Sequence, residues 1–275
     1  RFELEVPIWT GGELTKRARQ AGLAATAAAD SAAWTADQAA VNAAAAYVQL
    51  AQVREQVALL ERARETVAAH VEIARAYGEQ GMLVRSELLR AEVELARMDD
   101  LLAEARGYGR VAEANLAFRL NDPPGSAYEL APLPAPADLA AGREEWLAAA
   151  GGRRDLEAAR TLLAAGELEA EALKGGLLPR IGLVARHDLV DDSLFGTHGD
   201  STTIMAVASV DLVDLFRFGK RRSAIAAARA DAEAGREDVA RFEAGVRLEV
   251  AQAYELARVA LERRATAVQA LAAAE

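Results

Sequence analysis

The side chains best suited to chemistry are few and scattered along the chain. His70, His187 and His198 are far apart in the sequence, and the chain has no cysteine, so the spacing of a metal site is absent. The acid pairs Asp99-Asp100 and Asp191-Asp192 are sequence neighbours, which do not share one face of a helix. The sequence contains no nucleophile–base pattern and no phosphate-binding glycine loop. We therefore expect no enzyme, no cofactor and no metal site.

Charged residues that alternate with apolar ones are more informative. Residues 2–9 alternate in this way, which predicts a strand with one apolar and one charged face, and residues 177–189 and 202–215 are expected to form two more strands. Strands with an apolar and a polar face are typical of a membrane β-barrel filled with water, but a soluble half-buried sheet alternates too. Five charged residues would face the lumen of a barrel, or else belong to ordinary polar strand faces: Glu3, Glu5, Arg186, Asp188 and Asp211.

The composition excludes some classes of function. Acidic residues outnumber basic ones by 42 to 32, for a net charge of −10, which argues against a nucleic-acid partner because phosphate binding needs a basic face. Hydrophobic residues make up 52% of the chain but aromatic residues only 5%, a balance that favours closely packed helices over one thick core. No apolar run is long enough for a membrane-spanning helix. Because residue 1 lies inside a predicted strand and residue 275 inside a predicted helix, we expect the chain to be part of a longer protein.

A long helical hairpin accounts for the first half of the chain. Residues 13–76 contain no proline and a single glycine, so they are expected to form one helix of about 95 Å at 1.5 Å per residue. Thr10 and Glu13 are placed to form a capping box at its start. Apolar residues at three- and four-residue spacing predict a seam with a returning helix. The seam consists of Leu50, Val53, Val57, Leu60, Val67, Val71 and Ala74 on the first helix and Leu88, Ala91, Leu95, Met98, Leu102 and Ala105 on the second.

The tip of this hairpin is expected close to two glycines. Gly78 and Gly81 interrupt the helical pattern, and glycine tolerates the backbone angles that a chain reversal requires. The apolar run Met82, Leu83 and Val84 follows. Exposed at a tip, this run would favour a partner surface, although packing within an assembly would explain it equally well.

The rest of the chain is expected to hold a connector and a second strand–helix repeat. Five of the seven prolines lie in residues 121–137, which predicts an irregular segment, and short helices follow at about 138–150 and 153–175. A polar loop at 191–200 precedes the third strand, and the last helix runs from Lys220 to the end. We therefore divide the chain into residues 1–120, the first repeat with its tip near 78–86; residues 121–178, the connector and short helices; and residues 179–275, the second repeat.

Two strand-to-helix junctions match at a constant offset of 207 residues. This shift pairs Trp9 with Phe216, Gly12 with Gly219 and Tyr47 with Tyr254. The period is far above the 20–50 residues of solenoid repeats, so we expect the internal duplication of a whole unit. An aromatic residue at such a junction suits a membrane interface or a plug of the core equally well. The predicted junction sites are Trp9, Gly11, Gly12, Phe216 and Gly219.

These elements together resemble the TolC-like outer-membrane efflux proteins, the outer membrane factors of tripartite pumps. The resemblance covers essentially the whole chain and depends on the order and spacing of several segments. They are the strand-to-helix segments 7–12 and 214–219, the helical segments 41–47 and 248–254, the segment 177–181 before a strand, and the tip sequence 81–89.

The resemblance implies a mainly α fold with β strands. Long antiparallel helical hairpins would form a periplasmic tunnel, and the strands would join a trimeric, 12-stranded outer-membrane β-barrel. It also implies a homotrimer in the outer membrane of a Gram-negative bacterium, in contact with outer-membrane lipid, a periplasmic adaptor (membrane fusion) protein and an inner-membrane pump. The family pattern places a strand and a helix before residue 2 and a second tip after residue 275.

In this family, an acid at the position of Glu87 is expected to help close the tunnel, and the hairpin tip contacts the adaptor. The gating and docking residues that the resemblance implies are Gly78, Gly81, Met82, Leu83, Val84 and Glu87.

The expected function is a passive exit duct of an efflux or secretion system, gated at the periplasmic helical tips. The alternative is a soluble periplasmic coiled-coil adaptor or scaffold, because such proteins also have long helical hairpins. The doubled strand-to-helix junction and the apolar strand faces favour the duct. The sequence does not distinguish drugs, metals and proteins as the transported substrate.

Overall fold

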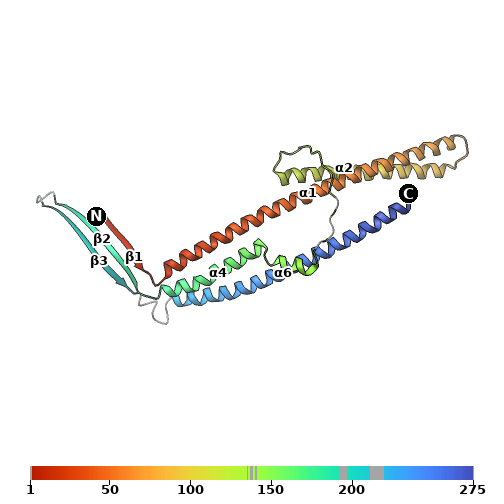
Figure 1. Cartoon of the computed structure of the whole chain (residues 1–275). Coiled ribbons are helices and arrows are strands. Elements are labelled where there is room, and N and C mark those ends of the chain that lie inside the picture. Colours follow the sequence, from red (N-terminus) through yellow and green to blue (C-terminus); the bar gives the residue numbers. More distant parts are fainter. Residues whose placement is uncertain are drawn as a thin grey trace. The chain divides into compact units, whose positions relative to one another are not determined.

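The computed structural model describes residues 2–134, 136, 139, 141–192, 197–210 and 220–274. They form two compact units, residues 1–34 with 138–275 and residues 35–137, and helix α1 has residues in both. The described helices include none that is both long and apolar enough to cross a bilayer. The elements are β1 (Phe2–Trp9), α1 (Glu13–Glu79), α2 (Arg85–Leu120), α3 (Arg143–Ala150), α4 (Arg154–Gly175), β2 (Arg180–Asp192), β3 (Thr197–Ser209) and α6 (Lys220–Ala274), as labelled in Figure 1.

The unit of residues 35–137 is a helical hairpin. The second part of α1 lies antiparallel to α2 (Figure 1), and every residue of the predicted seam is buried or half-buried. Leu50 is fully buried and forms a small core with Ala46, Ala112 and Leu116, which Tyr47 and other partly buried side chains cover. The predicted seam is thereby confirmed. A seam of small and medium apolar residues lets the two helices pack closely along their length.

Ion pairs between α1 and α2 fix the register of the hairpin. Three of them have positions on α1 separated by multiples of seven residues, the spacing of charged pairs that flank a coiled-coil seam, and a fourth pair, Arg64–Asp99, also joins the two helices. Each pair is partly exposed and contributes little stability alone, but the set opposes a shift of one helix along the other. The three pairs with this spacing and their N–O distances are Arg54–Glu113 at 2.8 Å, Glu61–Arg106 at 2.7 Å and Arg75–Glu92 at 3.1 Å.

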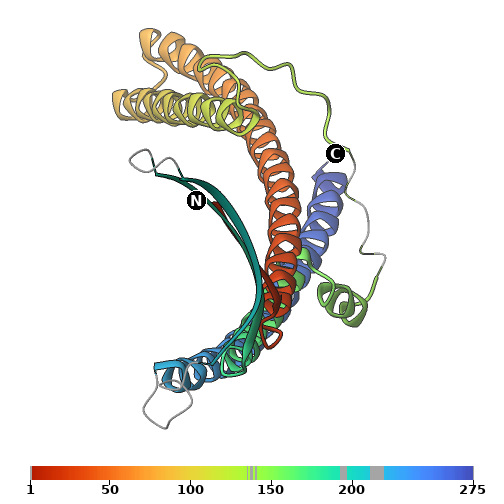
Figure 2. The same cartoon turned by 90° about the vertical axis from the view of Figure 1, so that its left-hand side faces the viewer.

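The other unit contains an antiparallel sheet in the order β1-β2-β3, whose strands curve together in Figure 2. In an antiparallel sheet, directly opposite residues project to the same face. The pairs Glu3–Arg186 and Arg186–Thr203 therefore define a polar face, and the pairs Leu4–Ala185 and Ala185–Ile204 define an apolar face. The expected alternation is confirmed for the three described strands.

Several element boundaries differ from the predictions. The first helix extends to Glu79 rather than 76, and the second strand covers Arg180–Asp192 rather than 177–189. The predicted polar loop 191–200 was too long, since β2 pairs with β3 as far as Asp192–Thr197; backbone pairing continues through polar side chains once two strands are in register. The third strand accordingly starts at Thr197 and ends at Ser209 rather than spanning 202–215, and residues 211–215 lie outside the described part. The short helix predicted at 138–150 begins only at Arg143.

Helix α6 begins at Lys220, which lies 207 residues after the first residue of α1. The two long helices thus start at positions related by the offset found in the sequence. This agreement favours the duplication, which stays a hypothesis.

Arg153 connects three helices of this unit. Its guanidinium lies 4.6 Å from the ring centroid of Trp34 on α1, donates to both carboxylate oxygens of Asp155 at 3.1 and 2.7 Å, and donates to Glu249 on α6 at 2.8 Å. These charge-assisted bonds raise the pKa of Arg153 above its usual value, against the opposing effect of burial. Arg153 therefore holds the start of α4 between α1 and α6.

We expect the Leu50→Ala substitution to destabilise the protein by about 2–5 kcal/mol, because it leaves a cavity in the closed seam. Guanidinium unfolding of the purified protein, followed by far-ultraviolet circular dichroism, measures this loss. Leu59→Ala is the matched control, since Leu59 is 61% exposed in the chain. Equal losses for the two variants would contradict the seam as the main source of hairpin stability.

Candidate functional site: the sheet, the strand–helix junction and the hairpin tip

The polar face of the sheet gathers the described residues that the sequence predicts for a lumen. Arg186 donates to Glu3 at 3.4 Å, and Glu5 lies two residues further along β1, on the same face by strand alternation. Asp188 shares this face with Arg186 for the same reason. Asp211 lies outside the described residues. A lumen role for these side chains stays a prediction, but the pairing register brings four of them to one face.

The opposite face of the sheet is apolar and exposed. Phe2, Leu4 and Ile8 on β1 are 63–68% exposed, and Ile204 on β3 is 68% exposed. Large apolar side chains gathered on one open face mark a surface that another apolar phase or partner covers.

The change from strand to helix after β1 depends on a close approach of two backbones. Gly11 has a φ of +64°, and a Cβ atom on it would lie 2.0 Å from the carbonyl oxygen of Gly175 at the end of α4. No other residue fits there without moving the backbone. The sequence pattern predicts a helix that ends near residue 175 and gives no sign of this contact. Trp9 is 42% exposed at the end of β1.

Two predicted junction sites, Phe216 and Gly219, lie outside the described residues. Gly12, like Gly11, has a positive φ, of +80°. The junction roles of these residues stay predictions.

A single carboxylate, that of Glu13, joins the elements that meet at this junction. Its Oε1 accepts from Arg17 at 3.2 Å, and its Oε2 accepts from Arg180 at 3.1 Å and from Arg221 at 3.5 Å. The guanidinium of Arg221 occupies the space where a Cβ on Gly176 would lie. Glu13 thereby ties the start of α1 to the starts of β2 and α6.

The predicted capping box is only half present. The Oγ1 of Thr10 accepts from the backbone N–H of Leu14 at 3.4 Å, but the Glu13 carboxylate turns to the arginines instead of the Thr10 backbone. Two of the charged partners of Glu13, Arg180 and Arg221, lie far away in the sequence, so local sequence patterns indicate only the capping role.

The charge environment lowers the pKa of Glu13. Burial alone would raise it, but the hydrogen bond from Arg17 and the charges of Arg221 and Arg180 outweigh burial and favour the ionised form. Ionised Glu13 is therefore the form that stabilises the junction.

The hairpin tip ends α1 with a left-handed glycine. Gly81 has a φ of +74°, its N–H donates to the Gly78 carbonyl at 3.0 Å, and the Met82 N–H donates to the Tyr77 carbonyl at 2.9 Å. This pattern is the Schellman motif. Gly78 itself is helical, so the prediction that it also needs special backbone angles is wrong; its open side faces Leu88, where the two helices approach.

The apolar residues of the tip are largely exposed. Met82 is 65% and Val84 is 69% exposed, whereas Leu83 is half-buried. Glu87, in the first turn of α2, accepts from Arg90 at 2.8 Å within its own helix. Both side chains of this pair are at least half exposed, so the bond is weak and open to exchange. Gating and docking by these residues stay predictions.

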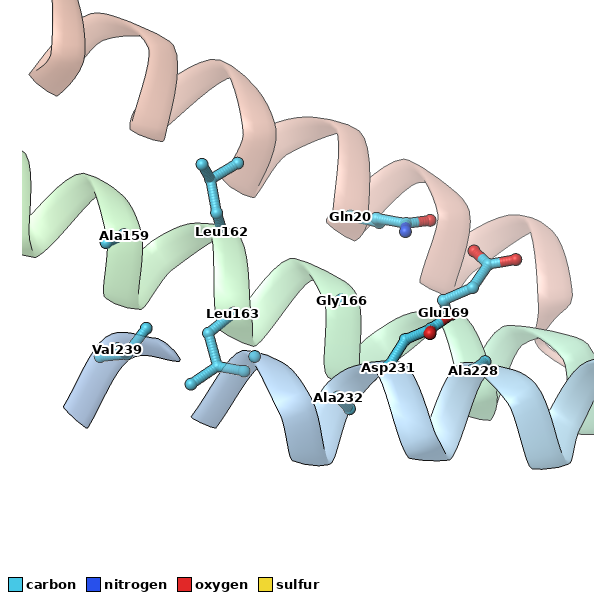
Figure 3. Close-up of a pocket in the computed structure, with 11 residues that line it drawn as sticks. Gln20, Ala159, Leu162, Leu163, Gly166, Glu169, Ala228, Asp231, Ala232 and Val239 are labelled. Carbon is cyan, nitrogen blue, oxygen red and sulfur yellow. The ribbon is translucent and has the colours of Figure 1, made fainter. Parts of the chain in front are cut away.

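Figure 3 shows a groove between α1, α4 and α6, with a volume of about 520 Å³. Small residues form much of its wall, such as Gly166 on α4 and Ala232 on α6, while Gln20 reaches it from α1. The lining is mostly apolar, and Glu169 and Asp231 stand at its edge (Figure 3). This groove offers no group arranged for catalysis.

The described residues contain no group of three or more histidine and acidic side chains placed to hold a metal ion. His187 instead shares a hydrogen bond of 2.9 Å with the Thr202 hydroxyl across β2 and β3. His70 lies on α1 and is exposed.

The Glu13→Gln variant should be less stable than the wild type by on the order of 2 kcal/mol at neutral pH, because it loses charge-assisted hydrogen bonds. Since the folded-state pKa of Glu13 is lowered, its contribution is present above the usual value of 4.5 and is lost as pH falls below it. Thermal unfolding at pH 7 and at lower pH measures both effects. The difference between variant and wild type should shrink on acidification, whereas Glu237→Gln, at an exposed acid of α6, should stay near wild type. A difference that does not change with pH would refute the proposed role of the carboxylate charge.

Comparisons with known proteins agree with this architecture. Residues 148–275 match the family model described as outer membrane efflux protein. No curated protein matches the chain at a significant level.

Among solved structures, the fold is similar to that of the outer-membrane channel OprN, with a TM-score of 0.84, 18% identity, and coverage of 97% of this chain and 60% of that chain. It is also similar to a membrane protein from Pseudomonas aeruginosa, with a TM-score of 0.76, 17% identity, and coverage of 97% and 62%. A third similar structure is the outer membrane protein VceC from Vibrio cholerae, with a TM-score of 0.75, 17% identity, and coverage of 96% and 61%.

The chain thus spans about three fifths of the length of these structures. At 17–18% identity these structures show the fold alone, and the family model adds a match over residues 148–275. Both findings favour the channel over the alternative of a soluble adaptor. They confirm the resemblance to the TolC-like outer-membrane efflux proteins that the sequence predicts.

Proposed function

We propose that the protein forms a passive exit duct: a homotrimeric outer-membrane channel of a tripartite efflux or secretion system. Its strands join a 12-stranded barrel in contact with outer-membrane lipid, and its helices form a tunnel in the periplasm. A periplasmic adaptor connects the duct to an inner-membrane pump, which supplies the energy. The duct itself carries out no reaction.

The observation that carries this proposal is the two-faced sheet that continues directly into long helices. One face exposes Phe2, Leu4 and Ile8, and the other carries Glu3 and Arg186. Lipid outside and water inside require this division in a barrel, because the outer side chains meet hydrocarbon and the inner ones meet solvent. A barrel also pairs the edges of the sheet, which are otherwise open to aggregation.

The helical hairpin supports the periplasmic part of the proposal. Gating would occur at its tip by an outward movement of the hairpins. Contacts with the adaptor and the pump would favour this movement. Such a shift requires contacts that differ between the closed and open states. The exposed Met82 and Val84 offer an adaptor surface, and the weak Glu87–Arg90 pair leaves Glu87 free to exchange partners with a neighbouring chain in the closed state.

The full-length protein should be recovered as a trimer from the outer-membrane fraction, and it should conduct ions in planar lipid bilayers. Chemical cross-linking of intact cells and mass determination in detergent measure the assembly, and bilayer recordings measure conduction. A monomer or dimer in the soluble fraction would contradict the proposed duct and favour the alternative, a soluble coiled-coil adaptor.

Under the proposed gating role, Glu87→Gln should increase the open probability of the channel in planar bilayers by several-fold, because a salt bridge or charged hydrogen bond is worth about 1 kcal/mol at such a site. Glu94→Gln is the matched control, since Glu94 pairs with Arg97 at the same i,i+3 spacing two turns away from the tip. If both variants open equally often, Glu87 has no special part in closing the tunnel.

A further inference from the structure

The chain leaves the helical hairpin through a segment that has no regular secondary structure. We call residues 126–134 the strap. Asn121, with a φ of 58°, ends α2 in a left-handed conformation, and Gly125 has a φ of +87°, so the chain turns sharply between α2 and the strap. Pro132 and Pro134 keep the strap extended, because proline fixes its own φ and disfavours a helical conformation in the residue before it.

Side chains of α1 bind the backbone of the strap at two points. Nη1 of Arg54 donates to the Tyr128 carbonyl at 2.8 Å, and the Tyr47 hydroxyl donates to the Ala131 carbonyl at 2.7 Å. The two donors are seven residues apart, which places them on one face of α1, about 10.5 Å apart along its axis. Three extended residues span about 10 Å. The two carbonyls therefore match the two donors in spacing, and the strap runs antiparallel to α1.

Arg54 also joins the strap to α2. Its Nη2 donates to Glu113 of α2 at 2.8 Å, so one guanidinium bonds to α2 and to the strap at the same time, as its forked geometry allows. The Tyr128 hydroxyl adds a bond of 2.9 Å to Asp122, directly after the end of α2. Hydrogen bonds thereby connect α1, α2 and the strap to one another.

The strap packs against the core of the hairpin through alternate side chains. Tyr128 and Leu130 pack against the buried cluster around Leu50, and Glu129 between them is exposed, as alternation in an extended chain requires. A cleft of about 750 Å³ lies between the strap and α1 near Ala51. The strap is therefore attached at a few points and is not packed along its whole length.

We propose that the strap opposes sliding of α1 against α2 at the root of the hairpin, meaning residues 46–54 and 112–120. Arg54 bonds to α2 and to the strap, so a shift of one helix along the other breaks these contacts. In the proposed duct, the strap restrains the tip movement that opens the tunnel, because its contacts exist only while the root is in register. The effect on opening rests on the proposed function, whereas the attachment of the strap does not.

Cleavage by glutamyl endopeptidase after Glu129 measures the attachment of the strap. Glu129 is exposed, but a protease needs a chain that has left the surface, so the cleavage rate follows the detached fraction. In the full-length protein in neutral detergent, Tyr47→Phe/Arg54→Gln removes both α1 donors and should raise this rate by at least about fivefold. Tyr47→Phe alone removes one hydroxyl and keeps the ring, so a smaller increase in this variant shows that the effect does not come from misfolding.

The matched control is Tyr77→Phe/Arg64→Gln, which makes the same two changes on α1 outside the strap. Arg64 pairs with Asp99 of α2, and Tyr77 is 50% exposed near the tip. This variant should be cleaved after Glu129 at the wild-type rate. Equal rates for Tyr47→Phe/Arg54→Gln and the wild type would overturn the inference.

Recordings in planar bilayers on the same preparations test the effect on opening. Tyr47→Phe/Arg54→Gln should increase the open probability by several-fold over both the wild type and the control. Faster cleavage with an unchanged open probability would show that the strap does not restrain opening, and would also overturn the inference. If the wild type does not conduct, the proposed function fails, and the cleavage rates alone decide whether the strap holds the root of the hairpin.

Discussion

At the base of the sheet, the carboxylate of Glu13 accepts hydrogen bonds from arginines of α1, β2 and α6. The starts of both long helices and the start of a strand therefore meet at one half-buried negative charge. Beside it, Gly11 lies against the carbonyl of Gly175 at a distance that excludes any side chain. These two contacts set the direction in which each helix leaves the sheet, and the arrangement of the unit depends on them (Figure 1).

From this junction, the helices are held by close packing of small residues rather than by a thick core. Alanine and glycine at the contacts of α4 with α6 permit a short distance between the helix axes. Small side chains contribute little hydrophobic free energy per residue. Charged groups therefore add further contacts between the helices. Arg153 binds three helices at once, and in the hairpin the ion pairs at multiples of seven residues fix the register.

Under the proposed function, one face of the sheet contacts lipid and the other contacts water. Alternation along each strand separates apolar from charged side chains, and the pairing register aligns the like faces of β1, β2 and β3. A slip of one residue would mix the two faces. The Glu3–Arg186 bond joins β1 and β2 on the polar face and favours the native register.

Much of the fold could be read from the sequence, because its signals are local and periodic. The strand alternation, the seam from Leu50 to Ala105, the reversal at Gly81 and the repeat offset all follow from spacing along one chain. The charged residues of the polar face were found in the same way. Strand ends near Asp192 were misplaced, because polar sequence signals a loop even where backbone pairing continues.

Only the tertiary structure brought together residues that have no sequence pattern in common. Glu13 lies 167 residues from Arg180 and 208 residues from Arg221 in the sequence, and the role of Gly175 depends on the close approach of the Gly11 backbone. The periodicity of the sequence determines which face of a helix or strand is apolar. The partner of a given charged side chain depends instead on where distant elements cross, and tertiary packing determines those crossings.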